Sequence, residues 1–199
     1  MSEIKFFNRW SAEGARVTDP GLQSYINFVP VMMPKTGARY AQDRFHKSKI
    51  TIVERFMNKL GVVGHKGKKH TYTSGTKTGK SQTHLRIMEE TLELVEQKTK
   101  MNPIVVLVSA IENAAPREEI VTIEYGGARY PKSVECAPQR RIDVALRNMT
   151  QSASAKAFNN KKGIVNALSE EIVAAYNLSS QSAAVQKKFD LERQADSSR

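Results

Sequence analysis

The chain has 199 residues, 40% of them hydrophobic and 26% charged, a composition typical of a folded globular protein rather than a disordered one. Lys and Arg outnumber Asp and Glu by 31 to 20, and the resulting net charge of +11 favours polyanionic partners. The sequence shows no membrane span or signal region, and the single cysteine, Cys136, allows no internal disulfide, so a reducing, intracellular compartment is expected.

Residues 1–47 are predicted to form an extended, basic N-terminal arm, called the basic arm below. Proline and glycine interrupt it repeatedly, so one short helical turn is expected, near residues 23–28. Apolar residues at three- and four-residue spacing then predict a helix that begins at an N-cap on Ser48 and ends at Gly61. The segment 61–80 is rich in glycine and lysine and has no acidic residue, which predicts a flexible loop.

Residues 48–199 are predicted to form a helical core with one β-hairpin. Apolar stripes and helix-start signals predict further helices at about 85–95, 103–111, 138–149, 155–176 and 183–194. Branched and aromatic residues on both sides of Gly126 and Gly127 predict a hairpin at about 119–135. About six helices against one hairpin indicate a mainly α fold class, a helical bundle in a single domain over 1–199.

The positive charge is concentrated in one part of the chain. Residues 35–80 carry twelve basic and two acidic side chains, whereas residues 1–34 carry three of each. Residues 139–163 form a second basic region, with six basic groups and one acid. A face that serves only solubility usually mixes both signs, so this pattern predicts nucleic-acid-binding surfaces. Aromatic residues beside these regions suit base stacking or ordinary packing equally: Tyr40, Phe45, Tyr72, Tyr125 and Tyr130.

Catalytic and metal-binding motifs fail on their spacing. A phosphate-binding loop of the Walker type needs four residues between its first glycine and the Gly-Lys-Ser at 79–81, but position 74 is Ser. His65, His70 and Cys136 do not have the spacing of metal ligands. Adjacent carboxylates such as those at 89–90 and 170–171 point apart on a helix. The sequence therefore predicts a non-enzymatic binding protein with no cofactor and no small-molecule substrate.

The order of these features resembles a known family. The segments that carry the resemblance are KFFNRWS at 5–11, GARYA at 37–41 with RFHK at 44–47, IVERFMNKL at 52–60, NPIVVLV at 102–108 with PREE at 116–119, GG at 126–127, PQRR at 138–141, and AAVQKK at 183–188 with SSR at 197–199. Together they resemble the universal family of ribosomal protein seven of the small subunit, in its archaeal and eukaryotic branch.

The resemblance implies a structural constituent of the small ribosomal subunit in the cytoplasm, with a helical fold and a protruding hairpin. It implies a primary binder of the 3′ major domain of 16S-type rRNA that helps nucleate assembly of the subunit head. The hairpin is then expected near exit-site tRNA and the mRNA path, beside ribosomal protein eleven of the platform and other head proteins. The alternative is a free-standing RNA-binding regulator of translation.

Candidate RNA contacts follow from the resemblance and from the charge. The resemblance places rRNA-facing cations in the arm, after the hairpin and near the C-terminus: Arg39, Arg44, Lys47, Lys49, Arg140, Arg141, Lys187 and Lys188. It places Gly126, Gly127, Arg129 and Lys132 in the hairpin near tRNA and mRNA. Charge alone adds Lys35, Lys66, Lys68, Lys69, Lys77 and Lys80, of which those in 62–80 lie in an extension relative to the family.

Overall fold

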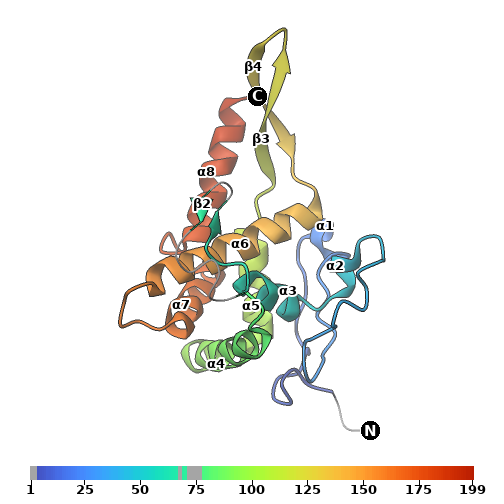
Figure 1. Ribbon diagram of the computed structural model, residues 1–199, viewed down its shortest axis with the longest axis vertical. Helices are drawn as coiled ribbons and strands as arrows, with labels where there is room; N and C mark the ends of the chain where they lie inside the picture. The colour runs from blue at the N-terminus through green and yellow to red at the C-terminus, as the bar shows by residue number, and fades with distance from the viewer. Residues whose placement is uncertain (1–3, 67–68, 71–77) are drawn as a thin grey trace.

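The computed structural model describes residues 4–66, 69–70 and 78–199 and shows a helical body from which one hairpin projects (Figure 1). The elements in chain order are α1 (Pro20–Gln23), α2 (His46–Lys49), α3 (Ile52–Leu60), β1 (His65–Lys66), β2 (Lys69–His70), α4 (Ser81–Thr99), α5 (Pro103–Ala114), β3 (Glu118–Tyr125), β4 (Ala128–Glu135), α6 (Pro138–Ala157), α7 (Ile164–Tyr176) and α8 (Ala183–Ser197). The predicted mainly α class, with a bundle and a hairpin, is confirmed.

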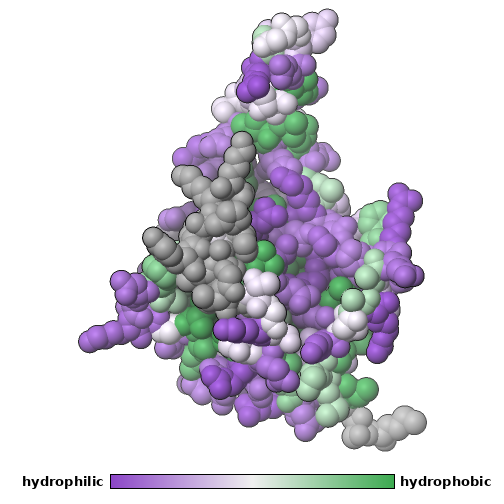
Figure 2. Space-filling view, viewed as in Figure 1, coloured by the Kyte–Doolittle hydropathy of each residue, from purple (hydrophilic) through white to green (hydrophobic). Residues whose placement is uncertain are grey.

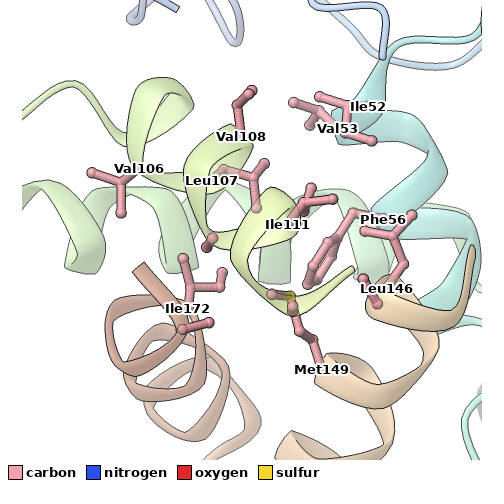
Figure 3. Packing of buried hydrophobic residues seen from close by; sticks show 14 of the residues in the cluster. Ile52, Val53, Phe56, Val106, Leu107, Val108, Ile111, Leu146, Met149 and Ile172 are labelled. Carbon is pink, nitrogen blue, oxygen red and sulfur yellow. The ribbon is translucent and has the colours of Figure 1, made fainter. Parts of the chain in front are cut away.

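Helix α5 forms the centre of the hydrophobic core. Its sequence is apolar on almost every side, and a helix of that kind is stable in water only when other elements surround it. Asn102 caps its start, because the side-chain oxygen accepts a hydrogen bond from the Ile104 amide at 3.0 Å. Side chains from α3, α6 and α7 converge on it, among them Phe56, Leu146 and Ile172 (Figure 3). Burial of each such side chain contributes about 1.5–3 kcal/mol.

The inner part of the basic arm, residues 4–28, packs on the helical body. Phe6 is fully buried, and Trp10, which is 5% exposed, donates from Nε1 to a Glu96 carboxylate oxygen at 2.8 Å. Leu22 and Ile26 join the same core. The helical turn expected at 23–28 was placed too late, because Asp19 caps an earlier turn, α1, by accepting a hydrogen bond from the Gly21 amide. Only the outer part of the basic arm, residues 29–45, is largely exposed.

The helix predicted to start at Ser48 begins instead at Ile52. Thr51 is its N-cap, with the hydroxyl accepting a hydrogen bond from the Glu54 amide. Ile50 has an extended backbone, with ψ of 138°, and therefore separates α3 from the short α2. The prediction was wrong because Ser48 and Thr51 both have the side chain of a capping residue, and the sequence could not show at which one the backbone turns.

The boundary between α6 and α7 also differs from the prediction. The expected helix from about 155 is two elements, because α6 continues to Ala157 and α7 begins only at Ile164. Phe158 is extended and Asn159 has a left-handed backbone, with φ of 50°. The break lets α7 turn back and pack against α4, α5 and α6.

The hairpin forms as predicted. β3 and β4 pair antiparallel from Glu118 opposite Glu135 to Tyr125 opposite Ala128. Gly126 and Gly127 have φ of 58° and 81°. A two-residue turn that matches the right-handed twist of the strands requires such positive φ values at both positions. Helix α8 lies beside the base of the hairpin (Figure 1), where Arg199 pairs with Glu118 and Glu192 accepts a hydrogen bond from the Arg117 amide.

The loop predicted at 61–80 contains a short antiparallel pair that the sequence did not indicate. His65 pairs with His70 and Lys66 with Lys69. The glycine and lysine content hid this pair, because a two-residue strand is too short for an alternating pattern. The rest of the loop prediction, at 67–68 and 71–77, lies outside the described residues.

Candidate nucleic-acid interface

The outer part of the basic arm exposes the cations that the sequence assigned to it. Lys35, Arg39 and Arg44 are exposed. The Arg44 guanidinium lies 5.3 Å from the centre of the Phe45 ring, which is itself 54% exposed. Phe45 has φ of 56°, a conformation that is unfavourable for a bulky side chain. A guanidinium and an aromatic ring held in water are suited to phosphate and to an unpaired base.

Lys49 also belongs to this exposed surface, but it already has local partners. Its ammonium lies 2.6 Å from an Asp43 carboxylate oxygen and 5.8 Å from the centre of the Tyr40 ring. Both members of the ion pair are about half exposed, so the pair contributes little to stability. Little free energy therefore holds the Lys49 ammonium to Asp43.

Lys47 points inward, to a carboxylate on α6. Its Nζ lies 2.5 Å from Asp143 Oδ2, while Arg55 Nη2 and Lys59 Nζ lie 3.4 Å and 3.7 Å from Asp143 Oδ1. Burial opposes ionisation of Asp143, but the Lys47 hydrogen bond and the surrounding cations outweigh it and hold the pKa below its ordinary value of 3.8. Lys47 was predicted as an RNA contact of the arm, whereas Lys59 was not among the individually predicted contacts.

Arg140 and Arg141 are neighbours in sequence with different surroundings. Arg140 is exposed and forms a two-point ion pair with Glu119, with contacts of 2.5 and 2.7 Å. Arg141 is buried: its Nη2 lies 2.6 Å from Asp19 Oδ2 and its Nε donates to the Pro116 carbonyl at 3.1 Å. The assignment of Arg141 to an RNA-facing surface is therefore corrected, because its guanidinium joins the inner arm to α6.

The two assigned lysines on α8 also have different surroundings. Lys187 is exposed. Lys188 is half-buried, and its Nζ donates to the Asn113 carbonyl near the end of α5 at 3.0 Å. Burial lowers the pKa of Lys188, partly offset by Glu192. A cation at the C-terminal end of a helix stabilises the helix dipole, so Lys188 serves the fold.

The hairpin presents two different faces. The pairing register puts Val121, Ile123, Tyr125 and Tyr130 on one face together with Lys132, and these four apolar or aromatic side chains are 42–81% exposed. Arg129 lies on the other face, 3.7 Å from Glu124. In Figure 2, hydrophobic patches on the hairpin lie next to hydrophilic ones, mostly on its part nearer the helical body.

Several assigned residues lie in the loop before α4. Lys80 is described and exposed at the start of α4. Lys68 and Lys77 lie outside the described residues, and for Lys66 and Lys69 the structure gives only the backbone. For His65 and His70, too, the structure gives only the backbone, so it does not test their side chains.

The described part of the chain holds no cluster of three or more side chains suited to a metal ion, and none of its helices has the length and apolarity to cross a membrane. Burial, with a contribution from Glu119, raises the pKa of the Cys136 thiol to about 11, so the thiolate that nucleophilic chemistry needs does not form near neutral pH.

Comparison with known proteins identifies the family. A sequence model described as "Ribosomal protein S7p/S5e" matches residues 22–199. "Small ribosomal subunit protein uS7" of Nanoarchaeum equitans is 49% identical over 197 residues, which cover 99% of this chain and 100% of that protein. Proteins with the same name from Methanococcus maripaludis and Methanococcoides burtonii are 43% and 40% identical over 198 and 195 residues, or 99% and 98% of this chain and 100% and 99% of theirs. The resemblance is thus confirmed, and the chain belongs to the ribosomal protein S7p/S5e family.

Proposed function

We propose that this chain is a structural constituent of the small ribosomal subunit in the cytoplasm, where it binds the 3′ major domain of the rRNA. Full-length identity of 40–49% to proteins named as small-subunit uS7 is the observation that carries the proposal. Hydrophilic residues cover the face between the hairpin and the arm (Figure 2), which gives a large polyanion room to bind.

The exposed cations provide the affinity for RNA. Lys35, Arg39 and Arg44 reach outward from the arm, and Lys80, Arg140 and Lys187 are exposed on the helical body. Each cation that meets a phosphate releases counterions, so binding weakens as salt rises. Because the inner arm is packed on the core, the outer arm is anchored at its start before RNA arrives, which lowers the entropic cost of binding.

Binding to the 3′ major domain by this chain then nucleates assembly of the subunit head. The protruding hairpin reaches exit-site tRNA and the mRNA path, beside ribosomal protein eleven of the platform. The support is the exposed face of the hairpin, where Tyr125 is 81% exposed and Tyr130 58% exposed. Exposed tyrosines are suited both to stacking on unpaired bases and to protein interfaces.

The test is a comparison of rRNA domains. The purified chain is titrated with separate transcripts of the 5′, central and 3′ major domains in magnesium, and the bound fraction is measured by filter retention. The 3′ major transcript is expected to bind at least 10³-fold more tightly than the others, the lower end of the usual gap between specific and non-specific nucleic-acid binding. Equal affinity for all three transcripts would contradict the proposal.

A further inference from the structure

We propose that Lys47, Lys59 and Arg147 form a binding site for one backbone phosphate of RNA, with Asp143 as the residue that positions them. The proposal rests on the proposed function and deepens it, because it gives the RNA a defined contact at the junction of α2, α3 and α6. Figure 1 shows these three elements adjacent to one another. Lys59 and Arg147 lie in the two basic regions of the sequence, but neither was among the individually assigned RNA contacts.

The site is built from three elements around one carboxylate. Lys47 Nζ, from α2, lies 2.5 Å from one Asp143 oxygen, and Lys59 Nζ, from α3, lies 3.7 Å from the other. Arg147 lies one helical turn after Asp143 on α6 and is exposed. Residues four apart lie on the same side of a helix, so Arg147 and Asp143 face the same region.

The charges at this junction do not balance. Three cations, Lys47, Arg55 and Lys59, surround the single carboxylate of Asp143. Arg147 adds a fourth positive charge near Lys59 and lowers its pKa, as Lys47 and Arg55 also do. Burial is the main cause of the lowered pKa of Lys59, and the neighbouring cations add to it. Holding several cations together out of water costs free energy unless an anion joins them. The side chains of Lys47 and Lys59 are still 40% and 26% exposed, so a phosphate can reach them.

Arg55 fixes the floor of the site. Its side chain is only 4% exposed, with Nη1 donating to the Tyr25 carbonyl at 3.0 Å and Nη2 directed at Asp143. Its Nε is buried and has no hydrogen-bond partner in the described part of the chain, and the same holds for the Ser48 hydroxyl beside Lys47. Arg55 is the buried member of this group and belongs to the folded core, whereas Lys47, Lys59 and Arg147 remain accessible to an anion from solvent.

The competing explanation is that the cluster only joins α2 to α3 and α6. A purely structural cluster predicts that loss of Lys59 and Arg147 changes stability and leaves RNA binding unchanged. A phosphate site predicts instead that the loss of Lys59 and Arg147 weakens RNA binding and leaves stability nearly unchanged. Both side chains are partly or fully exposed, so their replacement leaves no buried charge without a partner.

The experiment measures the salt dependence of RNA affinity for the full chain carrying Lys59→Gln and Arg147→Gln together. Two RNAs are used, the 3′ major-domain transcript and an unrelated RNA duplex. The expected result is a plot of log affinity against log salt that is flatter by roughly 0.7 to 0.9 unit for the one lost phosphate. Affinity at low salt should fall about tenfold, the value of a charge-assisted hydrogen bond. A double variant with Lys59→Arg and Arg147→Lys should keep most of the affinity and of the salt slope, because both positions keep their charge.

The matched control replaces one arginine and one lysine elsewhere. Arg9→Gln with Lys100→Gln removes the same charge beside the acidic surface of α4, where Arg9 lies near Glu89 and Glu93. A flatter slope on either RNA for the test variant and not for the control supports the site. Unchanged slopes on both RNAs overturn it. Equal binding of the wild-type chain to both RNAs would contradict the proposed function. The phosphate site would still be tested, because the salt slopes of the variant and the wild type can be compared on each RNA.

Discussion

At the scale of single residues, the structure separates cations that build the fold from cations that face solvent. Arg140 and Arg141 are adjacent and chemically identical, yet one helical step of about 100° points them in different directions. Arg141 contacts Asp19 and Pro116 inside the protein, whereas Arg140 is exposed and pairs with Glu119 at the surface. The Arg141 hydrogen bond is the main reason that the pKa of Asp19 is lowered. Sequence charge counts cannot make this distinction, since both residues add one unit.

The two arginines should respond in opposite ways to substitution. Arg141→Ala should lower the free energy of unfolding by about 2–3 kcal/mol, because it leaves Asp19 without its partner, and should leave the salt slope of rRNA binding unchanged. Arg140→Ala should barely change stability and should flatten the slope. Urea unfolding and filter binding at several salt concentrations measure the two effects. A flattened slope in folded Arg141→Ala would contradict the structural role.

Asp143 should make stability depend on pH in the acid range. Its pKa in the folded protein lies below the ordinary 3.8, so the folded state binds its proton less readily than the unfolded state. Its contribution is therefore complete above about pH 5 and is lost as the pH falls through the lowered pKa. Urea midpoints between pH 7 and pH 2.5 should fall less steeply for Asp143→Asn than for the wild type. The exposed Asp190→Asn is the control, and an identical pH profile for Asp143→Asn and wild type would refute the assignment.

At the scale of elements, strong local signals gave correct predictions. The hairpin was located to within one residue because the two glycines supply the left-handed backbone that its turn needs. Helix α5 was recognised because Asn102 and Pro103 form a standard helix start. Weak or duplicated local signals led to errors, as at Ser48 and Thr51, or at the break that begins with Phe158.

The turn of the hairpin is the element-scale prediction. Gly127→Val should destabilise the turn by about 1–2 kcal/mol, because a branched side chain is strained at φ of 81°. The effect should stay local, since Gly127 has no neighbour that a Cβ would touch. Hydrogen exchange should therefore speed up in 118–135 and stay unchanged in α5. Gly163→Ala is the control: this glycine has φ of −63° and open space, so its hairpin exchange should match the wild type.

At the scale of the whole molecule, a packed helical body carries two projecting parts, the hairpin and the outer arm (Figure 1). A protein that works free in the cytoplasm as a regulator and one that works within a ribosomal subunit would both bind RNA. They differ in where the native protein is found. In magnesium, the chain should sediment with small subunits on a sucrose gradient. Recovery mostly at the top of the gradient would favour the regulator.

A variant of the arm provides the control for that gradient. Replacing Arg39, Arg44, Lys47 and Lys49 by Ala removes two cations of the outer arm and two of α2, of which Lys47 is also a partner of Asp143. The variant should dissociate from small subunits at lower salt than the wild type does, because counterion release falls with each lost phosphate contact. Retention at the same salt would mean that the arm is not part of the RNA interface.

The sequence alone determined the helical class, the hairpin, the family resemblance and the two basic regions, because periodicity, turn chemistry and charge are properties of short segments. Only the tertiary structure showed that Phe6 and Trp10 belong to the core, that Arg141 and Lys188 are used inside the protein, and that Lys47 and Lys59 meet at Asp143. The contacts of Trp10, Arg141, Lys188 and Lys59 join residues 25 to 122 positions apart, and no local pattern encodes them. The net charge of +11 indicated a polyanion partner. The packing decided which of the charges are free to meet it.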